Sequence, residues 1–287
     1  MDRRRTRLHT SRTSKTIKTL QHTSSMDSIE LKAPQSWGEL TQQQLRYVFF
    51  LMTTFADMVV VKTYMFVRFT GIEVLSKGRF GWKCAYRPKG VHRRKVFYLQ
   101  PWQIHAFIQQ LAWVDSTEQM DNRLDVVQGL NAVHPLLQED ADTGRVIPFG
   151  DYLCMEQQYQ LFHSSHDEGH IDRLASFLYR HNDFSRPDEL TLTGPERLAT
   201  LAWFAHIKVV MSHAFPHFFR KVKGEDDISE LTVLESINTQ LRALTDGDVT
   251  KEKEVRGIDC WRALTELDAK AREADEIRRK YPKMANN

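Results

Sequence analysis

The chain has 287 residues, of which 41% are hydrophobic and 27% are charged, so it can bury a core and lacks the low hydrophobicity of a disordered protein. Its formal net charge of +3 is unevenly placed, because residues 1–25 contribute +6 and leave the rest of the chain at −3. By composition, the body is therefore not a basic nucleic-acid binder.

Residues 1–25 are rich in Arg, Ser and Thr and contain no apolar run, so they do not form a secretory signal. We expect a disordered basic leader. Hydrophobic patterning begins just after Met26, which favours a start codon assigned too early. The alternative is a genuine basic arm that contacts phosphates.

The first part of the body predicts two helices. Thr41 and Gln44 have the spacing of a capping box, so a helix should begin at Thr41. A second helical run, 58–69, should stop at Gly71, with a break near 56–57. The apolar stretch that includes both runs carries Asp57 and other charges, and a charge near the bilayer centre costs roughly 2.5–3.5 kcal/mol. We therefore expect buried core and not a membrane span.

Between residues 80 and 99 the hydrophobic period changes from helical spacing to two, which predicts a β-hairpin and the only sheet of the protein. Its connection, 87–95, is basic and contains no acidic residue. Clustered cations on an extended tip can neutralise phosphates, so this connection is a candidate contact for nucleic acid. The alternative is an ordinary solvated loop, which is the commoner role of such a tip, and the acidic body would oppose binding. The candidate residues are Arg87, Arg93, Arg94 and Lys95.

From Pro101 the chain returns to helical spacing. Residues 121–142 also suggest a helix, although Gly129 and Pro135 weaken that pattern. Two further helices are expected at 151–162 and 171–179. After them, Thr193 and Glu196 form a second capping box, and the helix that they start should end or kink at Pro216.

The C-terminal part begins with a charged linker at 221–230. An amphipathic helix is expected over 231–244, then a turn at 245–248, then one long charged helix whose apolar stripe starts at Val255. This organisation predicts three parts: a leader at 1–25, a helical body with the hairpin at 26–222, and a C-terminal helical hairpin at 223–287.

None of the common catalytic motifs is present, so we expect neither an enzyme nor a cofactor. His163, His166 and His170, with Asp167, have spacing that would suit metal ligands on a helix. Ser-Ser and a glycine within this stretch favour a solvated loop instead, and we expect no metal. Cys84, Cys154 and Cys260 are isolated from one another, which favours a reducing compartment and hence the cytoplasm.

The apolar stripe of the last helix includes Trp261, Leu264 and Leu267. Burial against its own domain is the usual role of such a stripe. The alternative is a partner-binding surface, because the charged linker would let the segment detach and tryptophan is a frequent interface anchor.

Several stretches together are similar to a group of proteins encoded in prophage and phage-like gene clusters of gut bacteria. They are 37–45, Trp203-Phe204, 215–219, 237–252 and 259–273. The resemblance spans most of 26–280 and implies a role in tail morphogenesis, similar to that of tail assembly chaperones. It supplies no catalytic residues.

The sequence thus predicts a mainly α protein with one small β-hairpin. We expect it to act by contact with another phage structural or assembly protein and not at a membrane. A nucleic-acid-binding protein that uses residues 87–95 is the alternative.

Overall fold

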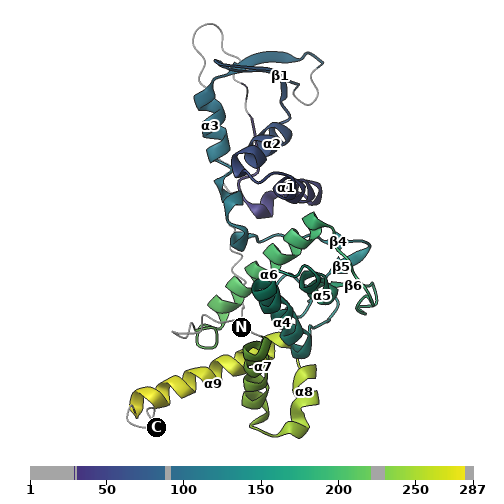
Figure 1. The fold of residues 1–287 in the computed structure, drawn as a ribbon, viewed down its shortest axis with the longest axis vertical. Helices are drawn as coiled ribbons and strands as arrows, with labels where there is room; N and C mark the ends of the chain where they lie inside the picture. The colour runs from purple at the N-terminus through teal and green to yellow at the C-terminus, as the bar shows by residue number, and fades with distance from the viewer. Residues whose placement is uncertain (1–28, 30, 88–91, 221–229, 282–287) are drawn as a thin grey trace, which may run out of the picture. The chain divides into compact units, whose positions relative to one another are not determined.

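The computed structural model describes residues 29, 31–87, 92–220 and 230–281 (Figure 1). These residues form two compact units. Unit 1 comprises Met1–Gln35 and Lys62–Leu111, and unit 2 comprises Ser36–Val61 and Ala112–Asn287. The boundaries therefore differ from the expected ones, because Lys62–Leu111 separates from the predicted body and the C-terminal helices group with the rest of it.

Unit 1 contains one antiparallel sheet of three strands in the order β1-β2-β3. Its elements are most of α2 (Met58–Thr70), then β1 (Glu73–Gly78), β2 (Gly81–Tyr86), β3 (Lys95–Leu99) and α3 (Pro101–Gln109). Figure 1 shows α2 and α3 on the same side of this sheet. The expected hairpin is confirmed as β2 and β3, and β1 is an additional strand.

Alternation along the strands explains which face of the sheet the helices cover. Cys84 pairs with Phe97, and both side chains are buried, as is that of Leu99. In the two helices, the buried rings of Phe66 in α2 and Phe107 in α3 stack with centroids 4.7 Å apart. Residues one position away along each strand point to the opposite face.

A second antiparallel sheet, β4-β5-β6, lies in unit 2, so the expectation of a single hairpin is wrong. Its strands are β4 (Val126–Val127), β5 (Leu130–Ala132) and β6 (Tyr179–Arg180). The helix suggested over 121–142 is wrong for the same reason. Gln128 and Gly129 between β4 and β5 have φ of 49° and 83°, and positive φ at both central residues is typical of a type I′ hairpin turn.

Unit 2 is otherwise helical and is built around α6 (Gly194–Ala214). The other helices are η1 (Trp37–Glu39), α1 (Gln42–Thr54), η2 (Ala112–Asp115), η3 (Thr117–Gln119), α4 (Phe149–Ser165), α5 (Gly169–Leu178), α7 (Glu230–Thr245), η4 (Val249–Lys251), α8 (Glu252–Gly257) and α9 (Cys260–Lys280). α6 packs against α1 and α5 and buries Trp203, Phe204 and Ile207. The protein is therefore mainly α, as predicted, with two small sheets.

Both expected capping boxes are present. Thr41 accepts a hydrogen bond from the Gln44 backbone N–H at the start of α1, and the side chain of Gln44 accepts one from the Thr41 N–H. Thr193 and Glu196 do the same at the start of α6. α6 ends at Ala214, two residues before Pro216, as predicted. Among the helices of the described residues, none is both long and apolar enough to span a membrane.

The C-terminal helices are joined to unit 2 through the start of α4. The Phe149 N–H donates to the Ile258 carbonyl at 2.8 Å, and the Cys260 N–H donates to the Ile147 carbonyl at 2.9 Å. The chain leaves the helical conformation here, and Asp259 caps the Arg262 N–H of α9. The expected single helix from Val255 is therefore two helices, α8 and α9. The predicted linker, 221–230, falls almost entirely outside the described residues.

Candidate nucleic-acid interface

Charge is strongly segregated along the folded chain. The segment Lys62–Leu111 of unit 1 contains ten Lys and Arg residues and one acidic residue, Glu73, for a net charge of +9. Residues 112–287 contain 21 basic and 31 acidic residues, for a net charge of −10. A small unit with this excess of cations is a ready contact for a polyanion.

The sheet face opposite α2 and α3 carries part of this charge, and we name it the open face. Its strand residues form two cross-strand rows, which the register defines. One row is Ser76, Lys83 and Tyr98, and the other is Glu73, Ala85 and Val96. Tyr98 is 67% exposed and Val96 is 52% exposed.

Two of the predicted nucleic-acid residues, Arg87 and Arg94, come together at one end of the open face. With Glu73 and Ala85 they line a hollow of about 350 Å³. The Arg94 Nη1 lies 3.2 Å from the Glu73 Oε2, so the one carboxylate of the segment partly neutralises this cation. Exposed ion pairs of this kind contribute little to stability.

The other two predicted residues lie elsewhere. Lys95 pairs with Tyr86 in the strand register, on the face that the helices cover. Arg93 is exposed in the segment before β3. The middle of the predicted connection, 88–91, falls outside the described residues. The structure thus divides the predicted cluster and adds Lys83 to the open face, where its strand neighbour is Tyr98.

Comparison with protein-family models, curated proteins and solved structures finds no match for this chain. The evidence for the candidate site therefore comes from the charge and geometry of this chain alone.

The predicted partner-binding residues lie largely inside unit 2. Leu264 is fully buried and Leu267 is 4% exposed. Trp261 is half-buried, and its ring contacts that of Phe215 edge-on at 5.0 Å. In this conformation the stripe of α9 packs on its own unit, which was the default interpretation of the pattern. A partner-binding surface at these residues stays a prediction that would require α9 to detach.

The three histidines of residues 163–170 have different surroundings. His163 packs edge-on against Tyr159 at 4.5 Å, and His166 ends α4 with a left-handed backbone. His170 Nδ1 lies 2.8 Å from the Gln158 Oε1. Across the described part of the chain, no three His, Cys, Asp or Glu side chains gather in a way that could hold a metal ion.

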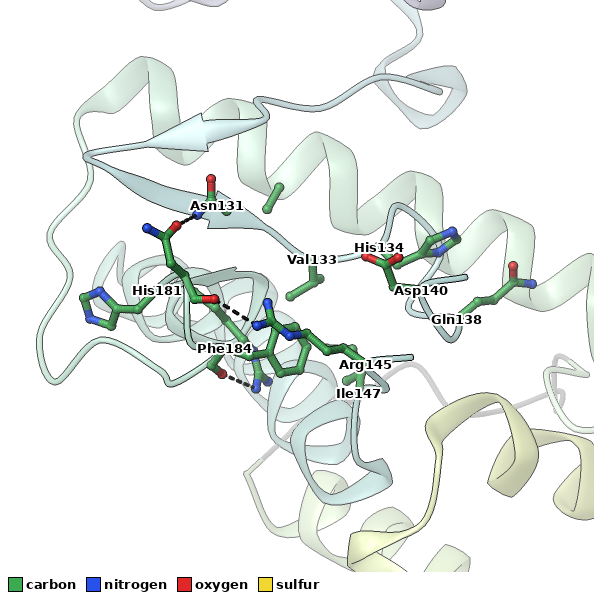
Figure 2. A pocket seen from close by; sticks show the side chains of 12 residues that line it. Asn131, Val133, His134, Gln138, Asp140, Arg145, Ile147, His181 and Phe184 are labelled. Atoms are coloured by element: carbon green, nitrogen blue, oxygen red, sulfur yellow. Dashed lines mark hydrogen bonds between the residues drawn. The ribbon is translucent and has the colours of Figure 1, made fainter. Parts of the chain in front are cut away.

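A cavity of about 310 Å³ lies in unit 2 beside the second sheet (Figure 2). Its charged groups already have partners within the chain. Arg180 pairs with Asp151 at 2.5 Å, Arg145 donates to the Asn182 carbonyl at 2.9 Å, and Asp140 accepts backbone N–H groups of its own turn. Burial, followed by the nearby Arg123 charge, lowers the pKa of His134 in this wall. These groups stabilise the loops around the cavity, and they offer no evident ligand chemistry.

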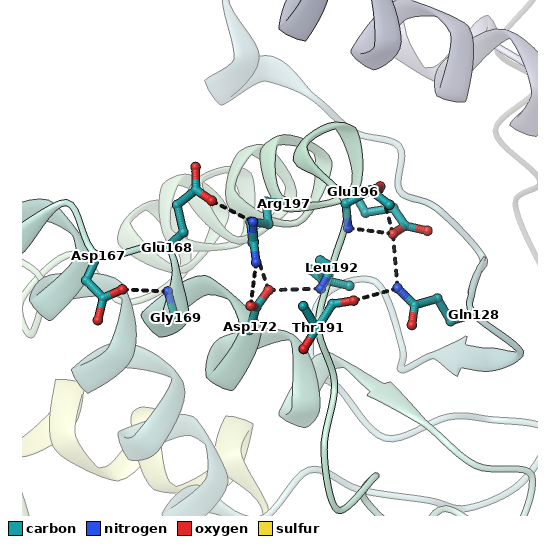
Figure 3. Close-up of polar contacts among 10 residues, drawn as sticks. Gln128, Asp167, Glu168, Gly169, Asp172, Thr191, Leu192, Glu196 and Arg197 are labelled. Carbon is teal, nitrogen blue, oxygen red and sulfur yellow. Dashed lines mark hydrogen bonds and ion pairs between the residues drawn. The ribbon is translucent and has the colours of Figure 1, made fainter.

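An ion-pair network connects α5 and α6 (Figure 3). Arg197 donates to both oxygens of Asp172, at 2.9 and 2.7 Å, and also to Glu168. Asp172 in turn accepts the Leu192 N–H at 3.1 Å. Burial acts to raise the pKa of Asp172, but the hydrogen bonds from Arg197 and Leu192 outweigh it, so the pKa lies below its usual value. This network joins elements of unit 2 and is a structural feature.

Proposed function

We propose that this chain is a non-enzymatic nucleic-acid-binding protein that contacts the phosphate backbone through residues 62–111 of unit 1. The observation that carries the proposal is the +9 net charge of that segment, with Glu73 as its one acidic residue. An ordinary soluble surface mixes both signs of charge. The positive charges of these 50 residues repel one another, which destabilises the folded unit. A bound polyanion would reduce this repulsion.

This positive charge would increase the affinity for nucleic acid directly. Each phosphate that a lysine or arginine neutralises releases condensed counterions, which favours binding and makes it weaken as salt rises. Lys83, Arg87 and Arg94 lie on or beside the open face, where they can reach a strand laid across it. The acidic remainder of the chain would be left out of this contact.

The alternative of protein–protein contact in phage tail assembly is supported by the sequence resemblance alone. The surface that it names is mostly buried, since Leu264 and Leu267 lie in the core of unit 2. Nucleic-acid binding is therefore the better supported of the two functions, and a tail-assembly role stays a prediction.

We further propose that the protein works in the cytoplasm. Cys84, Cys154 and Cys260 are all free thiols, and unpaired cysteines are usual in a reducing compartment.

The test compares two variants of the full chain that lose the same charge. Lys83→Ala/Arg87→Ala/Arg93→Ala removes three cations from unit 1, and Lys253→Ala/Arg279→Ala/Lys280→Ala removes three exposed cations from unit 2. Fluorescence anisotropy with a labelled oligonucleotide measures the dissociation constant over a range of salt concentrations.

We expect the unit 1 variant to bind more weakly. Its salt dependence should flatten by about 0.7–0.9 in logarithmic slope for each phosphate that the variant no longer neutralises. The unit 2 variant should bind like the wild type. Equal reductions in affinity for both variants would show that net charge, and not this segment, is responsible, and would refute the proposal.

A further inference from the structure

The open face has a feature that charge alone does not explain, which is an exposed aromatic ring at the end of a cross-strand row whose other members are polar. Tyr98 lies directly opposite Lys83 in the register, and Lys83 lies opposite Ser76. Directly paired residues in antiparallel strands place their Cβ atoms roughly 4.5–5.5 Å apart. The Tyr98 side chain, 67% exposed, thus lies next to that of Lys83, and Ser76 follows one strand further along the row.

A flat ring beside a cation matches the chemistry of an unpaired nucleotide. A base can stack on the ring while the adjacent phosphate lies against the lysine, and this arrangement tolerates any base because every base has a π face. In a duplex the base faces are already stacked on one another, and only their edges are accessible in the grooves. A stacking ring is therefore of little use against a duplex.

The other side chains of the open face point to the same ligand. Duplex sequence is read by side chains that form hydrogen bonds to base edges, above all Arg or Lys to guanine and Asn or Gln to adenine. Of these four residue types the two cross-strand rows contain Lys83 alone, and Arg87 and Arg94 lie at the end of the face. Two positions before Tyr98 on the same face of β3, Val96 adds exposed apolar surface that a second base could cover.

We propose that the open face binds single-stranded nucleic acid, with one base stacked on Tyr98 and the neighbouring phosphate held by Lys83. This inference rests on the proposed function, because it names the form of nucleic acid that the basic unit takes. The chemistry is shared by single-stranded DNA and RNA, and both are included in the test.

The experiment uses the full chain and four labelled probes of equal length: single-stranded DNA, single-stranded RNA, and a duplex of each. The variants are Tyr98→Ala, Tyr98→Phe and Trp102→Ala. Trp102 is a matched control because it is exposed to a similar degree, 62%, but belongs to α3 in the helical layer. Since Tyr98 is exposed, its replacement should leave the thermal unfolding of the protein unchanged.

We expect the wild type to prefer at least one single strand over its duplex. Tyr98→Ala should weaken single-strand binding by roughly 5- to 150-fold, the equivalent of about 1–3 kcal/mol for one stacked base. Tyr98→Phe retains the ring and should restore most of that affinity, whereas Trp102→Ala and all duplex measurements should change little.

Two other outcomes overturn the inference in distinguishable ways. Salt-dependent binding without single-strand preference, or with equal reductions from Tyr98→Ala and Trp102→Ala, refutes the stacking site and leaves the proposed function intact. No binding of the wild type to any of the four probes refutes both.

Discussion

At the scale of single residues, Glu73 is the one side chain of residues 62–111 that opposes a polyanion. Its carboxylate holds Arg94 at 3.2 Å beside the open face. Replacement by glutamine, Glu73→Gln, removes that charge and releases Arg94 for a phosphate. We predict that oligonucleotide affinity increases by roughly 1.4- to 5-fold, in keeping with the ~0.2–1 kcal/mol typical of exposed ion pairs.

The control for this prediction is Glu266→Gln, which removes an exposed carboxylate from α9 in unit 2 and should leave affinity unchanged. If Glu73→Gln binds no better than this control, Arg94 does not contact the nucleic acid.

The Asp172–Arg197 pair predicts a pH-dependent stability at the same scale. Asp172→Asn replaces a largely buried carboxylate that accepts two hydrogen bonds from Arg197, and we expect a decrease of about 1–3 kcal/mol in the unfolding free energy at pH 7. The pKa of Asp172 is lowered in the folded state, so its contribution is complete above the unfolded value near 4 and is lost as pH falls through the folded value.

Denaturant unfolding at a series of pH values measures this difference. The gap between wild type and Asp172→Asn should narrow below about pH 4. Glu168 pairs with the same arginine, but its carboxylate is 65% exposed. Glu168→Gln should therefore lower the unfolding free energy by less than ~1 kcal/mol. If the difference in unfolding free energy between wild type and Asp172→Asn stays constant as pH falls below about 4, the ionised Asp172 does not stabilise the fold.

Residue-level signals in the sequence predicted local structure well and burial poorly. The two capping boxes were confirmed because a cap depends on residues three positions apart. The stripe of Leu264 and Leu267 was identified as apolar, but a stripe does not reveal which surface covers it. That information comes from α4, which is distant in the sequence, together with the nearby α7.

At the scale of elements, the β1–β2 turn depends on one glycine. Gly81 has φ of +122°, and a Cβ there would lie 2.0 Å from the backbone oxygen of Leu99. We predict that Gly81→Ala destabilises unit 1 by more than ~1 kcal/mol and weakens nucleic-acid binding, because both the dihedral and the close approach oppose a side chain. Thermal unfolding and anisotropy check the two effects.

The matched control is Gly78→Ala, at the position that pairs with Gly81 across the turn. The nearest atom to a Cβ at Gly78 is 3.9 Å away, so this change should be tolerated. Equal stability of the two variants would refute the argument.

The strands that were not predicted from the sequence have one feature in common, which is an interrupted or very short alternation of apolar and polar residues. β1 contains a register irregularity between Val74 and Ser76, so its residues do not alternate cleanly. β4 and β5 are too short to show a period, and their apolar residues recur by chance at helical spacing. In contrast β2, six residues with clear alternation, was located correctly.

At the scale of the whole molecule, the total charge concealed the candidate site. The chain has a net charge of +3, and residues 26–287 have a net charge of −3. Both totals combine residues 62–111, at +9, with residues 112–287, at −10. The charges could be counted from the sequence, but the division at Lys62 and Leu111 could not, because it depends on long-range contacts between α2, the sheet and α3. The open face likewise requires the strand register.

The most direct test of the central claim is the salt dependence of oligonucleotide binding by the full wild-type chain, measured by anisotropy from about 25 to 300 mM salt. Binding through the basic unit predicts a linear fall of log K with log salt concentration, with a slope near −0.7 to −0.9 for each phosphate bound and therefore of several units. Absence of binding at the lowest salt, or an affinity that salt does not change, would contradict the account.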